Sequence, residues 1–273
     1  MYRIAIEKLL KWKQSKRRKP LIIEGARQVG KTWLMKEFGR QSYADTVYIN
    51  FDSNSRMAEL FASDLDTDRL IMGLELYVGH KIDPNNSLLV FDEVQEVPRA
   101  LASLKYFYEN APQYHIVCAG SLLGIALHQG TSFPVGKVDF LKLYPLSFKE
   151  FLMATGKEQF AALLDSQDFQ MITSFKQTYI DALKHYYFVG GMPEAVQSFT
   201  ENKDFNEVRE IQKGFLRHTS RISPSTLPMR SFQDCVCYGI VFLLSWRKKT
   251  KNSYTVSCVK ARAQKTTKPP FYG

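Results

Sequence analysis

The residues best suited to chemistry form one short loop, Gly25, Ala26, Arg27, Gln28, Val29, Gly30, Lys31 and Thr32. A glycine followed after four residues by Gly-Lys-Thr is typical of a loop that binds a chain of phosphates. Glycines let backbone N–H groups approach the phosphates closely, where a Cβ would obstruct them. We expect Lys31 to reach the β- and γ-phosphates and the Thr32 hydroxyl to ligate Mg²⁺. The alternative is a turn that binds nothing, and the flanking strand and helix patterns favour the binding loop.

A pair of carboxylates, Asp92 and Glu93, forms the second candidate group. The pair follows an apolar run, residues 88–91, which is typical of a strand buried on both faces of a parallel sheet. The carboxyl end of such a strand opens into the crevice where ligands bind. We predict that Asp92 holds Mg²⁺ through its water shell, and that Glu93 deprotonates the water that attacks the γ-phosphate.

The elements that must position these groups alternate between strands and helices up to about residue 145. Runs of apolar, β-branched and aromatic residues predict strands at 21–23, 46–51, 87–91, 114–119 and 138–143. Apolar positions at helical spacing predict helices at 3–14, 31–38, 55–62, 67–78 and 98–109. This order predicts an α/β fold for residues 1–145, a P-loop NTPase whose parallel sheet is sandwiched by helices.

Residues 146–215 show helical patterns alone, which predicts a small helical subdomain. Ser147 and Glu150 have the spacing of a capping box that starts a helix. Apolar side chains then recur every three to four residues from Met171 to Tyr186, and Gly190-Gly191-Met192-Pro193 interrupts the pattern.

Composition and motifs exclude several functional classes. The first 20 residues are charged throughout, without a signal-peptide apolar block, and the longest apolar run, 236–246, is too short to span a bilayer. Four irregularly spaced cysteines argue against disulfides and zinc, and favour a reducing compartment. We therefore expect a cytoplasmic protein that does not use a membrane.

The formal net charge of +10 belongs to the end of the chain. Up to Phe215 there are 26 Lys and Arg against 26 Asp and Glu, whereas residues 216–273 hold 11 basic residues and one acid, Asp234. These last residues have no sustained strand or helix period, so we predict an irregular basic tail. A nucleic-acid-binding arm is the functional alternative for this tail.

With these motifs in place, residues 1–215 resemble a bacterial and archaeal family of AAA-superfamily ATPases whose C-terminal half is a domain of unknown function. The segments that carry the resemblance are residues 25–32, 88–93, 119–121, 144–148 and 190–194. The Arg27-Gln28 pair and the Leu-Tyr-Pro-Leu-Ser-Phe turn are the most distinctive of them.

The resemblance implies ATP and Mg²⁺ as cofactors and ATP hydrolysis as the reaction. It also implies that Ser121, at the end of the strand 114–119, senses the γ-phosphate or holds the attacking water. A role as the N-cap of a helix expected at residues 122–127 explains Ser121 equally well. At Gly136-Lys137 the chain has lysine where an arginine finger would stand, so none is assigned. The client, protein or nucleic acid, and the oligomeric state stay open.

The resemblance ends near residue 215, and we interpret the tail as the product of a frameshift. Residues 216–228 and 238–249 can both be back-translated into codons that are then read in a neighbouring frame. In one and the same shifted frame, the two stretches encode segments that resemble the continuation of the family's sequences. The nucleotide sequence of the gene tests this hypothesis, because a stop codon at once in that frame excludes it.

Three other functions are weighed against ATP hydrolysis. A GTPase is disfavoured because Asn202-Lys203-Asp204 has its acid one position too early for guanine recognition. A small-molecule kinase is compatible with the phosphate-binding loop alone, but the Asp92-Glu93 pair favours hydrolysis. A switch that binds nucleotide without useful turnover is the remaining alternative.

Overall fold

The computed structural model describes residues 1–120 and 136–220. The chain divides into two compact units, residues 1–215 and 216–273. Ser121, the helix expected at 122–127 and residues 221–273 of the tail lie outside the described residues. Residues 216–220, predicted to belong to the irregular tail, are helical.

Five parallel strands form one sheet in the order β2-β3-β4-β1-β5. The strands are β1 (Leu21–Gly25), β2 (Asp45–Asn50), β3 (Ser87–Asp92), β4 (His115–Ala119) and β5 (Asp139–Leu143). Their bounds lie within two residues of the predicted ones. The first strand in sequence thus lies between the last two, in register from Leu21 opposite Asp139 to Gly25 opposite Leu143.

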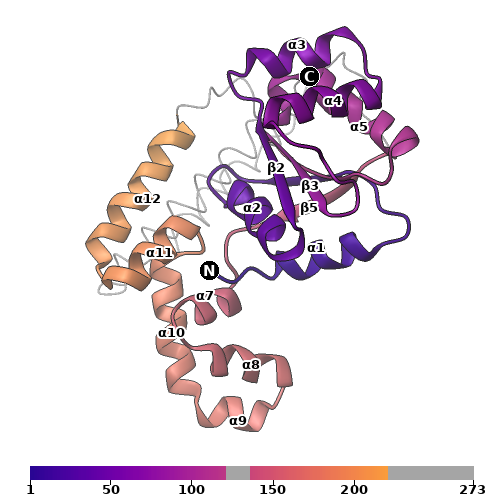
Figure 1. Cartoon of the computed structure of the whole chain (residues 1–273). Helices are drawn as coiled ribbons and strands as arrows, with labels where there is room; N and C mark the ends of the chain where they lie inside the picture. Colours follow the sequence, from indigo (N-terminus) through magenta and orange to yellow (C-terminus); the bar gives the residue numbers. More distant parts are fainter. Residues whose placement is uncertain (121–135, 221–273) are drawn as a thin grey trace, which may run out of the picture. The chain divides into compact units, whose positions relative to one another are not determined.

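Helices cover both faces of the sheet, as Figure 1 shows. The helices of this part are α1 (Ala5–Gln14), α2 (Lys31–Ser42), α3 (Ser55–Ser63), α4 (Thr67–Val78) and α5 (Pro98–Asn110), with a 3₁₀ turn η1 (Val94–Glu96). Because side chains alternate along a strand, Leu89 and Phe91 pack under α3, α4 and α5, whereas Leu88 and Val90 pack under α1 and α2. The predicted fold class is confirmed.

The chain between residues 146 and 220 is mainly helical. It comprises α7 (Phe148–Ala154), α8 (Glu158–Ser166), α9 (Phe169–Ser174), α10 (Lys176–Val189), α11 (Pro193–Asn202) and α12 (Phe205–Ser220). The Ser147 side chain caps α7 in a capping box with Glu150, as predicted. Two small apolar clusters hold these helices, one around Phe151 and Phe199 and one around Leu152 and Tyr179.

The apolar run from Met171 to Tyr186 is divided between two helices at Phe175, rather than forming one face. Met171 and Phe175 are 48% and 46% exposed, while Tyr179 further along is buried. Among the described residues, no helix combines the length and apolarity that crossing a membrane requires.

Candidate functional site

The loop from Gly25 to Thr32 connects the end of β1 to the start of α2 at the carboxyl end of the sheet. Gly30 has a φ of 94°, a conformation that glycine adopts at little cost. A Cβ on Gly25 would lie 2.5 Å from the carbonyl oxygen of Leu143 on the neighbouring strand. The backbone itself therefore favours glycine at both positions, a reason separate from the predicted close approach of phosphates.

Lys31 lies folded back over the loop that precedes it. Its Nζ donates to the carbonyl oxygens of Gly25 at 3.1 Å and Ala26 at 3.0 Å. Burial lowers the pKa of Lys31, and the nearby carboxylates of Glu93 and Asp92 oppose that effect. A buried cation at the first turn of a helix, beside backbone N–H groups, suits a polyphosphate.

Asp92 ends β3 and is 3% exposed. Its Oδ2 accepts hydrogen bonds from the Thr32 hydroxyl at 2.6 Å and from the Tyr48 hydroxyl at 3.0 Å. Its Oδ1 accepts from the backbone N–H of Glu93 at 3.1 Å. The two residues expected to serve Mg²⁺, Thr32 and Asp92, are thus in direct contact, although sixty positions separate them in the chain.

Glu93 follows in a left-handed backbone conformation, with a φ of 50°. Non-glycine residues rarely adopt it, and it often marks a functional turn. The Glu93 carboxylate accepts a hydrogen bond of 2.6 Å from Nε2 of Gln95, which is buried in η1. The side-chain oxygen of Gln95, Oε1, has no hydrogen-bond partner. Gln95 therefore orients Glu93 through its amide nitrogen, while its own amide oxygen accepts no hydrogen bond.

The structure brings together four of the predicted site residues, Lys31, Thr32, Asp92 and Glu93. Of the remaining loop residues, Val29 is buried, whereas Ala26, Arg27 and Gln28 are exposed. Lys137, where no arginine finger was assigned, forms an ion pair of 3.0 Å with Glu109. Ser121 lies outside the described residues.

Sequence reasoning missed two residues that contact these carboxylates. Tyr48 lies in the middle of β2 and Gln95 in η1, and neither belongs to a motif with a fixed spacing. The one signal for Tyr48 is its hydroxyl between the apolar neighbours Val47 and Ile49.

The donor set fits a nucleoside triphosphate with Mg²⁺. A hydroxyl and a carboxylate are ligands that Mg²⁺ accepts while it keeps several waters and the substrate phosphates. Residues 1–120 and 136–220 hold no group of three or more His, Cys, Asp or Glu that would bind a metal without a nucleotide.

A parallel sheet in this order, with a glycine-rich loop between β1 and α2, defines the class of P-loop nucleoside triphosphatases. Residues 17–152 match the family model described as "AAA domain", and this part of the chain belongs to that family, the P-loop AAA ATPases. An AAA domain implies ATP binding and hydrolysis, with Mg²⁺, as a class property.

Several solved structures are similar to the chain. The Drosophila ORC bound to DNA matches at 14% identity and a TM-score of 0.40, over 82% of this chain and 69% of that one. The Aeropyrum pernix ORC1 protein in complex with DNA matches at 15% identity and a TM-score of 0.35, over 60% and 53%. C. elegans PCH-2 matches at 13% identity and a TM-score of 0.39, over 76% and 65%. No curated protein matches the sequence.

Proposed function

We propose that the chain binds Mg-ATP on residues 25–32 and hydrolyses it. The observation that carries the proposal is the hydrogen bond of 2.6 Å between the Thr32 hydroxyl and Asp92, beside the buried Lys31. It supports the proposal because the three side chains proposed to ligate the metal, support it and bind phosphate lie together.

Each residue has a separate role in this proposal. The loop N–H groups and Lys31 bind the β- and γ-phosphates, and Thr32 and Asp92 hold Mg²⁺, which neutralises charge that develops on the phosphate oxygens. Glu93 accepts the proton of the attacking water. Ser121 is proposed to sense the γ-phosphate or to position that water, following the resemblance. Catalysis by such a site is mostly positional and electrostatic.

Two variants of the full chain test the proposal. Glu93→Gln keeps the size of the side chain but removes the base, so we expect phosphate release to fall at least about a hundredfold while ATP still binds. Lys31→Ala is expected to weaken binding itself. Binding is measured by calorimetry with ATP and Mg²⁺, and turnover by phosphate release. If wild type and Glu93→Gln release phosphate equally slowly, the hydrolase proposal is wrong and ATP binding alone stands.

The bond between Gln95 and Glu93 favours a second candidate, a nucleotide-gated switch with little turnover. In the present arrangement the Gln95 amide donates to one oxygen of the proposed base, Oε2. This hydrogen bond favours the present position of the carboxylate and opposes its movement toward a water molecule elsewhere in the site. The client that such a switch would serve, protein or nucleic acid, is unknown.

Gln95→Met distinguishes the two candidates, because it removes the amide donor and keeps a flexible side chain of similar size. Since a hydrogen bond to a charged group contributes about 1.5 to 3 kcal/mol, we expect turnover at saturating ATP to rise about tenfold with ATP affinity unchanged. A fall in turnover toward the Glu93→Gln level would instead show that Gln95 orients the base.

A further inference from the structure

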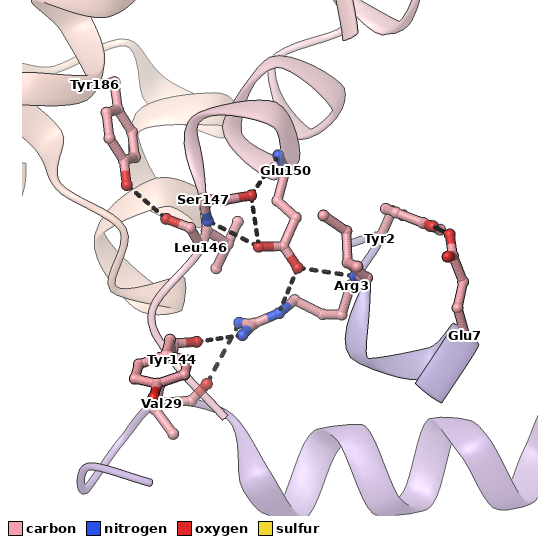
Figure 2. Close-up of polar contacts among 10 residues, drawn as sticks. Tyr2, Arg3, Glu7, Val29, Tyr144, Leu146, Ser147, Glu150 and Tyr186 are labelled. Carbon is pink, nitrogen blue, oxygen red and sulfur yellow. Dashed lines mark hydrogen bonds and ion pairs between the residues drawn. The ribbon is translucent and has the colours of Figure 1, made fainter. Parts of the chain in front are cut away.

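Arg3, just before α1, has its side chain buried between three segments that are distant in sequence. Nη1 donates to the carbonyl oxygen of Val29 in the phosphate-binding loop at 3.4 Å, and Nη2 donates to that of Tyr144 at 2.5 Å. Nε lies 3.2 Å from Oε1 of Glu150 in an ion pair whose two side chains are 5% and 7% exposed. Figure 2 shows the guanidinium with these three partners around it.

Glu150, in the first turn of α7, makes polar contacts through both carboxylate oxygens. Oε1 accepts from the backbone N–H of Ile4 at 2.9 Å as well as facing Arg3. Oε2 accepts from the backbone N–H of Ser147 at 2.8 Å and from its hydroxyl at 3.0 Å. The pair thus joins the N-terminal segment, the phosphate-binding loop and the start of the helical region.

The contact between Arg3 and the Val29 carbonyl oxygen affects the direction in which the loop's backbone N–H groups point. In a planar trans peptide the C=O and the following N–H point in opposite directions. Because Arg3 holds the Val29 carbonyl on its own side, the N–H of Gly30 must point to the other side. Gly30 lies at the N-cap of α2, where an N–H group serves an anion.

The turn before α7, which contains Tyr144 and Leu146, contacts the glycine-rich segment before α11. The N–H of Leu146 donates to the carbonyl of Gly191 at 2.6 Å, and the Tyr186 hydroxyl donates to the carbonyl of Leu146 at 2.8 Å. A Cβ on Gly191 would lie 2.3 Å from that carbonyl oxygen. A Cβ on Gly30 would lie 3.6 Å from the Pro193 ring. The helical region therefore packs closely behind the phosphate-binding loop.

We propose that Arg3 is a positioning residue for the phosphate-binding loop, and that the Arg3–Glu150 ion pair couples nucleotide binding to the first turn of α7. The inference rests on the proposed function for the identity of the ligand. In this proposal the guanidinium, paired with Glu150 and donating from Nη1 and Nη2 to two carbonyl oxygens, orients the peptide between Val29 and Gly30.

Arg3→Lys is the main test, because it keeps the charge beside Glu150 but cannot reach three acceptors at fixed angles. We expect the Kd for the slowly hydrolysed analogue ATPγS with Mg²⁺ to rise about tenfold, the loss of about one hydrogen bond. KM for ATP should rise with it, while kcat changes less than about threefold. The matched control is Lys149→Met, which breaks the neighbouring Lys149–Asp165 ion pair away from the loop and should leave the Kd unchanged.

Amide hydrogen exchange gives a readout that does not need catalysis. Without nucleotide, residues 26–32 should exchange faster in Arg3→Lys than in wild type, while α5 is unchanged. In wild type, Mg-ATPγS should slow exchange at residues 144–150, and Arg3→Lys should lose that effect. Arg3→Met with Glu150→Gln, which leaves no buried charge unpaired, should repeat both results.

The outcomes separate the two proposals. A wild-type chain that binds no Mg-ATPγS would sink the proposed function, and the nucleotide-free exchange at residues 26–32 would still decide the positioning role. The coupling is wrong if wild type binds the analogue without protection at residues 144–150. The positioning role is wrong if folded Arg3→Lys keeps both the wild-type Kd and the wild-type exchange at residues 26–32.

Discussion

Asp92 accepts hydrogen bonds from two hydroxyls on the same oxygen, and the one from Tyr48 comes from a neighbouring strand. Tyr48 is held in turn by the Lys36 ammonium, whose Nζ lies 3.8 Å from the centre of its ring. Burial, first, and then the negative charge of Asp92 raise the pKa of the Tyr48 hydroxyl, so it remains a donor throughout the physiological range. Tyr48 therefore fixes which lone pairs Asp92 presents to the proposed metal.

Tyr48→Phe removes this donor and keeps the ring. We expect about a tenfold higher Mg²⁺ concentration for half-maximal phosphate release, since partners that orient a metal-supporting carboxylate typically contribute that much to metal affinity. A titration of turnover with Mg²⁺ at fixed ATP measures the shift, and Tyr77→Phe, on α4, is the control. An unchanged Mg²⁺ dependence would place Tyr48 outside the metal's surroundings.

At this scale the sequence predicts residues whose spacing is dictated by the ligand. In the proposed site one phosphate chain meets Gly30, Lys31 and Thr32, so the three are adjacent, whereas Asp92 and Glu93 follow an apolar strand because that strand is buried. Tyr48 and Arg3 reach the site through tertiary structure, and Gln95 reaches it through the short turn η1, for which no motif has a fixed spacing.

At the scale of elements, His115 at the start of β4 lies in an aromatic group beneath α1. Its Nδ1 lies 2.6 Å from the Tyr43 hydroxyl, and Trp12 packs edge-on against its ring at a centroid distance of 6.2 Å. Burial lowers the pKa of His115 to about 4, helped by the charges of Arg18 and Lys13. The folded protein therefore keeps this ring neutral where the unfolded chain binds a proton.

This difference predicts acid sensitivity. The stability that the neutral His115 ring contributes to the folded protein is fully present above the unfolded-state pKa of about 6.5. It is lost as pH falls toward 4, because only the unfolded state gains a proton in that window. We expect a loss of about 2–3 kcal/mol in the free energy of unfolding. His115→Asn keeps an acceptor for Tyr43 but does not titrate, so its stability should fall less over the same range in urea unfolding. Parallel pH profiles would contradict the assignment.

The elements themselves follow from the sequence more completely than their arrangement does. The predicted helix 67–78 coincides with α4, and the capping box at Ser147 forms as expected. The position of β1 between β4 and β5 depends on how helices cross over the sheet, which no strand encodes alone. The division of α9 from α10 at Phe175 was missed because apolar spacing continues across it.

At the scale of the whole molecule, charge separates the chain at the same point where its two units meet. Residues 1–215 are formally neutral, whereas the 11 basic residues of the tail face one acid. The basicity of the protein therefore says little about the AAA domain.

A chain ended after Ser220 tests this separation. Nonspecific affinity for nucleic acid comes from basic side chains that neutralise phosphates, so the full chain should bind a DNA duplex with an affinity that falls steeply as salt rises. The shortened chain should not bind the duplex at 150 mM salt, roughly the physiological level. Both should bind Mg-ATPγS alike. Equal DNA affinity of the two chains in a salt titration would place a nucleic-acid surface within residues 1–220.

The place of β1 in the sheet has a consequence for biosynthesis. β1 is made first, yet its only partners in the described sheet are β4 and β5, which are made last. A nascent chain that ends before residue 139 can pair β2 with β3, but β1 can pair on one edge only because β5 has not been made. Gly25 then lacks its partner Leu143. Since contacts that are distant in sequence form late, the ribosome must release almost the whole AAA domain before the phosphate-binding loop takes shape. The newly made chain thus passes much of its synthesis with an incomplete nucleotide site.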